Sequence, residues 1–384
     1  MKDSPQIYLD HQASCPLDER VFAAISEHFT GPAANCHSSE HSFGWRASKA
    51  VLQAQEQIAA MIGADADEIV FTSGATEANN LALFGRDYSH RPKLITTAIE
   101  HKCVLEAARL LGADRGVEVA TVEVDSNGVV RLDHLAELVD ERTAVVSVIG
   151  VHNEIGTVQP IDEIAAIAKR SGASLHLDLA QGPSAIPLEQ ISSLADTLSL
   201  SAHKMYGPMG IGCLYVTREQ QAHLAPQIVG GGQQNGLRSG TIPVPLAVGM
   251  GEAANIVSNS PEERDRLRRL NGLLWAKLTA LGSEIELNGP PIDVRHPGNL
   301  NVCFRGYDSR DLIAAMQPNV AASSGSACNS GTEEPSYVLQ MIGNSVETAR
   351  SSMRLCVGRS TTDQQVTSAV DYIGEALRRF EVTY

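Results

Sequence analysis

The sequence predicts an α/β protein with a mostly parallel sheet flanked by helices, followed by a smaller α+β domain. Seven short runs rich in β-branched residues alternate with helical patterns through the first 220 residues. Alternation of this kind is typical of a largely parallel sheet with helices on both faces. After Gly240 the pattern changes to longer helical stretches with fewer and shorter strand candidates.

The elements follow in order along the chain. Residues 45–62 carry apolar side chains at helical spacing, and this stripe stops at Gly63, which suits a helix end. The second domain has helix candidates at 245–257 and 263–282, and residues 321–335, rich in Ser and Gly, are expected to form a loop. The strand candidates are residues 68–74, 93–99, 118–124, 144–150, 174–179, 197–201, 211–216, 284–287, 300–304 and 354–358.

Composition excludes several classes of protein. The 384 residues include 45 Asp plus Glu against 30 Lys plus Arg, a formal net charge of −15, so direct binding of nucleic acid is not expected. No stretch approaches the ~20 apolar residues of a membrane helix, and the N-terminal sequence lacks the apolar core of a secretory signal. The seven scattered cysteines fit neither a disulfide framework nor a zinc site. We therefore expect a cytoplasmic protein without membrane contact or bound metal.

Residues 201–210, SAHKMYGPMG, place a lysine between a strand candidate and a glycine-rich turn. Ser201, His203 and Lys204 would lie at the carboxyl end of that strand, where α/β proteins bind ligands. Most lysines are surface residues, and that alternative applies to Lys204 as well. A lysine flanked by a hydroxyl, an imidazole and glycines nevertheless has what an anionic cofactor held through an amine requires.

Asp178 ends the strand candidate of residues 174–179 and is followed by Gln181. A carboxylate at the end of a buried strand is costly unless it meets a positive or proton-bearing partner. A protonated pyridine nitrogen would be such a partner. The alternative is an aspartate that only caps the following turn.

Two further segments give weaker indications. In residues 71–83 a strand breaks at Gly74 and a helix begins near Thr76, which creates an anion site suited to a phosphate. The same S-G-x-T pattern also begins ordinary helices. His101 follows the strand candidate of residues 93–99, where it would stack on a flat ring or simply lie at a helix start.

The order of the motifs is more specific than any one of them. SGATEANN, EHK, NEIGTVQP, DLAQG, SAHKMYGP, GGGQQNGLRSGT, SSGSAC and RSSMRLCVGR follow one another along the chain. This succession closely resembles the cysteine desulfurases of the NifS and IscS kind, within the class-V aminotransferases and fold-type I pyridoxal-phosphate enzymes. The resemblance implies a large domain of residues 15–258 with a seven-stranded sheet. It implies a small domain of residues 1–14 and 259–384 that carries a mobile Cys328 loop.

The resemblance also implies roles for individual residues. Lys204 resembles the lysine that binds pyridoxal 5'-phosphate covalently, and Asp178 the residue that keeps the pyridine nitrogen protonated. His101 resembles the histidine that stacks on the ring and is implicated in proton transfer. The other implied cofactor contacts are Gly74, Ala75, Thr76, Ser201 and His203 at the phosphate, and Asn153 and Gln181 near the ring hydroxyl.

Substrate and sulfur chemistry are implied in the same way. Arg354 matches the arginine that pairs with the substrate carboxylate, although an unassigned arginine is more often a surface residue, and Asn153 is the second implied substrate contact. Thr241 matches a threonine that reaches the phosphate of the other subunit, which implies a homodimer. Cys328 aligns with the persulfide-forming cysteine, and its Ser- and Gly-rich flanks suit a thiolate that needs exposure and mobility. The other cysteines are expected to be mostly buried and inert.

The implied activity converts L-cysteine to L-alanine and passes the sulfur to Cys328 as a persulfide. The long form of the Cys328 loop resembles enzymes that deliver sulfur directly to an acceptor protein such as an iron-sulfur scaffold, for iron-sulfur cluster, thio-cofactor or nucleic-acid sulfur biosynthesis. Two alternatives remain open. One is a pyridoxal-phosphate-dependent cystine or selenocysteine lyase, and the other is an inactive scaffold that binds the cofactor.

Three departures from the family pattern stand out. Gln234-Asn235 replaces the common Glu-Arg, so dimer contacts or partner choice are expected to differ. His11-Gln12 and Cys36 replace Asn-Ala and Pro in segments that the family places near the active site. We expect these two replacements to affect substrate access or specificity.

Overall fold

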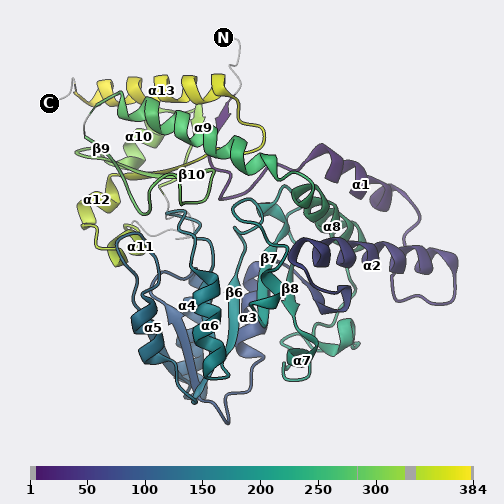
Figure 1. The fold of residues 1–384 in the computed structure, drawn as a ribbon. Coiled ribbons are helices and arrows are strands. Elements are labelled where there is room, and N and C mark those ends of the chain that lie inside the picture. The colour runs from purple at the N-terminus through teal and green to yellow at the C-terminus, as the bar shows by residue number, and fades with distance from the viewer. Residues whose placement is uncertain (1–5, 283, 325–333, 382–384) are drawn as a thin grey trace.

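The computed structural model describes residues 6–282, 284–324 and 334–381. A seven-stranded sheet with its helices forms one part of the molecule, and a three-stranded sheet under two long helices forms the other (Figure 1). Cys328 lies outside the described residues. No described helix combines the length and apolar character needed to cross a membrane.

The large sheet has the strand order β2-β8-β7-β6-β5-β3-β4. The two antiparallel pairings of this sheet both involve β8, and its other pairings are parallel, so the mostly parallel sheet expected from the sequence is confirmed. The strands are β2 (Ile69–Thr72), β3 (Lys93–Thr97), β4 (Glu118–Val122), β5 (Thr143–Ile149), β6 (Ser174–Asp178), β7 (Thr197–Ser201) and β8 (Gly212–Val216).

Helices cover both faces of this sheet. Leu94 and Ile95 are neighbours on β3 and therefore point to opposite faces, and they belong to different apolar cores. The core around Ile95 includes side chains from α1 (Glu19–Thr30), α2 (Ser42–Ile62), α5 (Leu132–Leu138), α6 (Ile161–Arg170) and α8 (Val244–Ser258). The opposite face packs against α3 (Ala75–Phe84) and α4 (Lys102–Arg115), and the short helix α7 (Arg218–Gln221) follows β8.

The end of α2 illustrates how the sequence determines these boundaries. Gly63 caps the helix with φ of 75°, a left-handed conformation that glycine adopts without steric cost. The helix stop expected at this residue is confirmed.

The smaller sheet is antiparallel, in the order β12 (Ser352–Cys356), β10 (Asn299–Phe304) and β9 (Ile285–Leu287). Helices α9 (Glu262–Thr279) and α13 (Asp363–Glu381) lie side by side above it (Figure 1). The short helices of this part are α10 (Ser309–Ala315), α11 (Tyr337–Met341) and α12 (Val346–Arg350).

The N-terminal segment joins this second part of the molecule. β1 (Ile7–Tyr8) pairs with β11 (Val320–Ala321) in parallel, and both Ile7 and Leu9 belong to the apolar core under α9 and α13. The expectation of a loop from Ala321 onward was therefore wrong at its first residue, which gains backbone pairing from a strand more than 300 residues away. The exact domain boundaries stay a prediction.

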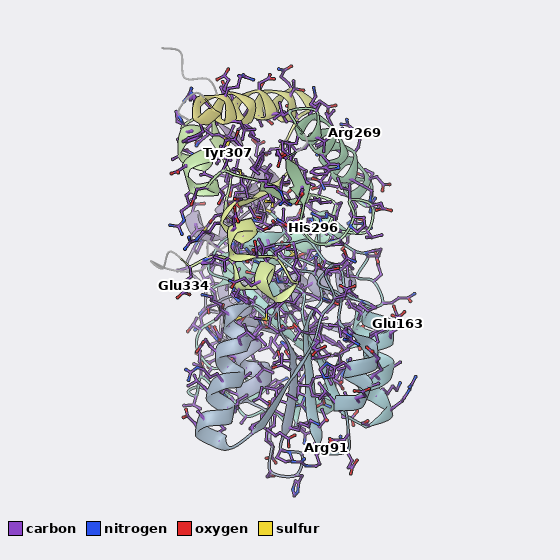
Figure 2. The ribbon with its side chains drawn as sticks, turned by 90° about the vertical axis from the view of Figure 1, so that its left-hand side faces the viewer. Arg91, Glu163, Arg269, His296, Tyr307 and Glu334 are labelled. Atoms are coloured by element: carbon purple, nitrogen blue, oxygen red, sulfur yellow. The ribbon has the colours of Figure 1, made fainter. Side chains whose placement is uncertain are left out.

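The parallel strands end at one edge of the large sheet, toward the smaller part of the molecule. In Figure 2, Arg91, which precedes β3, lies at the far end, whereas His296, between β9 and β10, lies near the middle of the molecule. The segments after β2, β3, β5, β6 and β7 all begin at this inner edge, where ligand sites of α/β folds usually form.

Candidate active site

A cavity of about 620 Å³ lies at the carboxyl edge of the large sheet. It brings together side chains that are far apart in the sequence but follow neighbouring strands. The expected site residues that line it are Gly74, Ala75, Thr76, His101, Asn153, Asp178, Gln181, Ser201, His203, Lys204 and Arg354. Thr241 is exposed and does not contribute to the lining.

Lys204 ends a short 3₁₀ turn, Ala202–Lys204, that directly follows β7. Its Nζ donates to the backbone carbonyl oxygens of Gln12 at 2.6 Å and Ala13 at 2.8 Å. The Gln12 carbonyl also accepts from Gln181 Nε2 at 2.9 Å. The N-terminal segment thus holds the amine at the cavity wall, and the surface-lysine alternative is wrong.

Asp178 is the last residue of β6 and is almost fully buried. Its Oδ1 accepts from the Ala180 N–H at 3.0 Å, so the turn-capping alternative holds as well. Its Oδ2 accepts from Asn79 Nδ2 at 2.7 Å. Within the described ranges no lysine, arginine or histidine forms a salt bridge with this carboxylate, which leaves its charge available to a cationic ligand atom in the cavity.

The start of α3 forms an anion-binding end of the cavity. Gly74 precedes the helix without a side-chain cap, and the N–H groups of a first helical turn have no partner inside the helix. Residue 212 packs closely against this helix start and must be glycine, because a Cβ at its position would lie 2.7 Å from the Gly74 Cα. Burial, together with the nearby Lys204 charge, lowers the pKa of His203 to about 4.

His101 is the N-cap of α4, and its Nδ1 accepts from the Cys103 backbone N–H at 3.2 Å. The helix-start alternative is therefore confirmed, and the same ring also lines the cavity. Cys103 lies beside it, with its Sγ 3.0 Å from His101 Nδ1, and also lines the cavity. Nothing in the residue pattern around Cys103 points to this contact.

Arg354 is buried, with an exposed fraction of 2%, so the surface alternative is wrong. Its Nη1 donates to the Asn153 carbonyl oxygen at 2.9 Å, and its Nη2 forms an ion pair with Asp10 Oδ1 at 2.6 Å. These two contacts fix the guanidinium plane beside the cavity.

The sequence departures have specific structural settings. Gln12 lines the cavity, whereas His11 is buried with its ring 5.0 Å from that of Tyr8 and 6.2 Å from that of Tyr206. Gln234 accepts from the Phe71 backbone N–H at 2.6 Å and donates to its carbonyl at 3.0 Å, so it pairs with the edge strand β2 as a backbone would.

The remaining described cysteines fit the expectation of inert thiols. Burial is the main cause that raises the pKa of Cys15 and Cys356 to about 12. It also raises the pKa of Cys213 and Cys303. Cys36 is half-buried and does not line the cavity.

Comparison with known proteins identifies the family. Residues 7–368 match the family described as Aminotransferase class-V. The chain belongs to the class-V aminotransferase family. It is 45% identical over 373 residues to a cysteine desulfurase IscS of Rickettsia bellii (strain OSU 85-389), covering 96% of this chain and 90% of that protein.

Solved structures of similar proteins agree with this assignment. A NifS-like protein superimposes with a TM-score of 0.89 at 31% identity, covering 97% of this chain and 99% of that chain. SspA in complex with cysteine superimposes with a TM-score of 0.79 at 34% identity, covering 92% and 99%. Within the family, the chain therefore groups with the cysteine desulfurases.

Proposed function

We propose that this class-V aminotransferase is a pyridoxal-phosphate-dependent cysteine desulfurase that converts L-cysteine to L-alanine and transfers the sulfur to Cys328. One observation carries the proposal: Lys204, Asp178 and Arg354 line a single cavity in a chain that belongs with the cysteine desulfurases. An amine, a buried carboxylate and a guanidinium are the groups that an amino acid and an aldehyde cofactor require.

The cavity fits pyridoxal phosphate chemically. Lys204 supplies the amine that would hold the aldehyde, and Asp178 supplies a buried carboxylate for a protonated pyridine nitrogen. The α3 start, with the Thr76 and Ser201 hydroxyls and the neutral His203 ring, supplies hydrogen-bond groups for the phosphate. Asn153 and Gln181 complete the lining.

Each residue then has a task in the reaction. Bound pyridoxal phosphate supplies an electron sink that makes the Cα proton of an attached amino acid acidic. Arg354 holds the substrate carboxylate, and its anchoring by Asp10 and the Asn153 carbonyl keeps that carboxylate in one place. Lys204 and His101 carry protons to and from the substrate carbons.

Cys328 receives the sulfur. Its thiolate attacks the sulfur of L-cysteine, the S–Cβ bond breaks, and Cβ gains a proton to complete alanine. The substrate sulfur remains on the enzyme as Cys328–S–SH, so atoms and electrons balance without an external oxidant. A second thiol, on an acceptor protein such as an iron-sulfur scaffold, then removes that sulfur.

The chain is also proposed to act as a homodimer. Thr241 is exposed and lies outside the cavity lining of its own chain, which suits a residue that reaches the phosphate site of a partner subunit. Light scattering of the purified protein measures its mass, and Thr241→Ala should weaken cofactor binding in a dimer. A monomer that binds the cofactor equally well with and without Thr241 would contradict this role.

The products from L-cysteine test the proposed reaction. Cofactor-loaded protein is incubated with L-cysteine and dithiothreitol, and alanine, sulfide and pyruvate are quantified together. Alanine and sulfide in equal amounts support desulfuration. Pyruvate and ammonia would instead indicate a lyase. The absence of turnover would indicate an inactive scaffold.

Two variants test the sulfur acceptor on the enzyme. Cys328→Ala should keep the bound cofactor and abolish sulfide release, because the thiol proposed to take the sulfur is removed. Cys303→Ala is the matched control, since it removes a thiol on β10 that does not line the cavity. An unchanged rate in Cys328→Ala would exclude Cys328 from the reaction.

A further inference from the structure

A chain of buried polar side chains leads from the middle of the large sheet to Asp178. Thr197 on β7, His176 on β6 and Asn79 on α3 are each no more than 1% exposed. Thr197 Oγ1 lies 2.9 Å from His176 Nδ1, and His176 Nε2 lies 2.9 Å from Asn79 Oδ1. Asn79 Nδ2 completes the chain by donating to Asp178 Oδ2 at 2.7 Å.

The carboxylate of Asp178, at the end of this row of hydrogen-bonded side chains, determines where the protons of the row lie. An ionised carboxylate only accepts hydrogen bonds, so the amide nitrogen of Asn79 must face Asp178 and its oxygen must face His176. His176 therefore carries its proton on Nε2, and its Nδ1 accepts from the Thr197 hydroxyl. Burial is the main cause that lowers the pKa of His176 to about 4, in keeping with a neutral ring that carries one proton.

Every donor in the chain thus points toward Asp178. Hydrogen bonds aligned in this way polarise one another and stabilise negative charge at the acceptor. These contacts hold the Asp178 carboxylate in one orientation toward the cavity.

A second branch connects the same amide to His101. Asn79 Nδ2 also donates to Cys103 Sγ at 3.2 Å, and that sulfur lies 3.0 Å from His101 Nδ1. Because the Cys103 backbone N–H donates to Nδ1 as well, this nitrogen is an acceptor. Asn79 therefore contacts Asp178 directly and the ring of His101 through Cys103.

We propose that Asn79 is a positioning residue for the cofactor, acting through Asp178 directly and through Cys103 on His101. This inference rests on the proposed function, because that function assigns Asp178 and His101 to the cofactor ring.

Asn79→Leu tests the proposal, because leucine is similar in size but has no hydrogen-bonding group. The readouts are the affinity of the apo-protein for pyridoxal phosphate, the absorption spectrum of the bound cofactor between pH 6 and 9, and kcat and KM for L-cysteine. We expect cofactor affinity to fall by about 10- to 100-fold, the range expected for loss of a hydrogen bond to a charged group. The pH at which the absorption spectrum of the bound cofactor changes should shift, and kcat should fall by a larger factor than KM rises.

Two companion variants separate positioning from packing. Thr197→Val removes only the hydroxyl at the far end of the chain and should shift the same readouts in the same direction by a smaller factor. Asn80→Ala is the matched control, because Asn80 is the next residue on α3 and its side chain donates outside the network, to the Thr76 carbonyl at 2.7 Å. It should leave the absorption spectrum unchanged.

Wild-type cofactor affinity and spectrum in Asn79→Leu would overturn the proposal. If that variant does not fold, Thr197→Val is tested in its place. The proposal is then overturned if the absorption spectrum of the cofactor bound to Thr197→Val changes with pH as it does in wild type. A wild-type protein that binds pyridoxal phosphate but makes no alanine refutes the proposed function alone, since the binding and spectral comparisons still stand. A wild-type protein that binds no pyridoxal phosphate refutes both.

Discussion

Glu100 is a fully buried carboxyl group whose replacement makes a quantitative prediction. Its Oε1 accepts from the Thr97 hydroxyl and from the Ile149 N–H, each at 2.7 Å, while its Oε2 has no hydrogen-bond partner among the described residues. Burial raises the pKa of Glu100 from 4.5 to about 8, against the effect of those two hydrogen bonds, and the charge of Asp178 raises it further. The group is therefore neutral in the folded protein at pH 6.

The direction of the pH effect follows from this shift. Because the pKa in the folded state lies above that in the unfolded state, the neutral carboxyl contributes stability that is fully present below pH 4.5. That contribution is lost as pH rises toward 8. Between pH 5 and pH 8 the loss is about 3 kcal/mol, from 1.36 kcal/mol per pKa unit. Glu100→Gln keeps an oxygen acceptor and removes the titration, so the variant should not suffer this loss.

The assay is urea unfolding of the cofactor-loaded protein at pH 5 and pH 8. The difference in unfolding free energy between Glu100→Gln and wild type should move in favour of the variant by about 3 kcal/mol from pH 5 to pH 8. Glu137→Gln, at an exposed position of α5, removes a carboxyl group without changing the core and is the matched control. If the difference for Glu100→Gln is the same at both pH values, the buried neutral carboxyl is refuted.

Three further substitutions have defined outcomes. Arg354→Lys keeps the charge but loses the two-pronged donor, so KM for L-cysteine should rise by about tenfold or more in steady-state assays; an unchanged KM would contradict the carboxylate contact. Gln234→Ala leaves the Phe71 backbone pair of β2 without its partner and should cost about 1–3 kcal/mol in urea unfolding, whereas no loss would mean that water replaces the side chain. Leu198→Ala creates a cavity at a fully buried position of β7 and should cost about 2–5 kcal/mol by the same measurement, and a cost below 1 kcal/mol would indicate collapse of the site.

The sequence predicted the strands of the large sheet and most of the cavity lining for one physical reason. Parallel strands end at a common edge, so polar residues that follow different strands, such as Asp178 and His101, converge without further information. The resemblance to a family then supplied the roles that spacing alone leaves open. Thr241 and Cys328 depend entirely on that resemblance, because one lies outside the cavity lining and the other outside the described residues.

Asn79 and Cys103 could not be found in this way. Asn79 and Asn80 are adjacent and chemically identical, and only the rotation of α3 against the sheet buries one of them beside Asp178 and leaves the other partly exposed. Cys103 lies in the first turn of α4, where its sulfur reaches the ring of the residue that caps the same helix. Side-chain contacts of this kind depend on the rotation of a helix about its axis and on its packing, and residue type alone determines neither.

The departure at residues 11 and 12 shows a different limit. Lys204 contacts this segment through the backbone carbonyl oxygens of Gln12 and Ala13, and any residue type supplies such an oxygen. The Gln12 side chain is engaged elsewhere, because its Oε1 accepts from the Asn299 amide and from the Cys356 thiol of the smaller sheet. Replacement of the family residue therefore leaves the lysine anchor intact and adds a polar link between the cavity wall and the smaller sheet. Gln12 would thus affect substrate access both as part of the cavity lining and through the position of that sheet, whereas the chemistry at Lys204 would be retained.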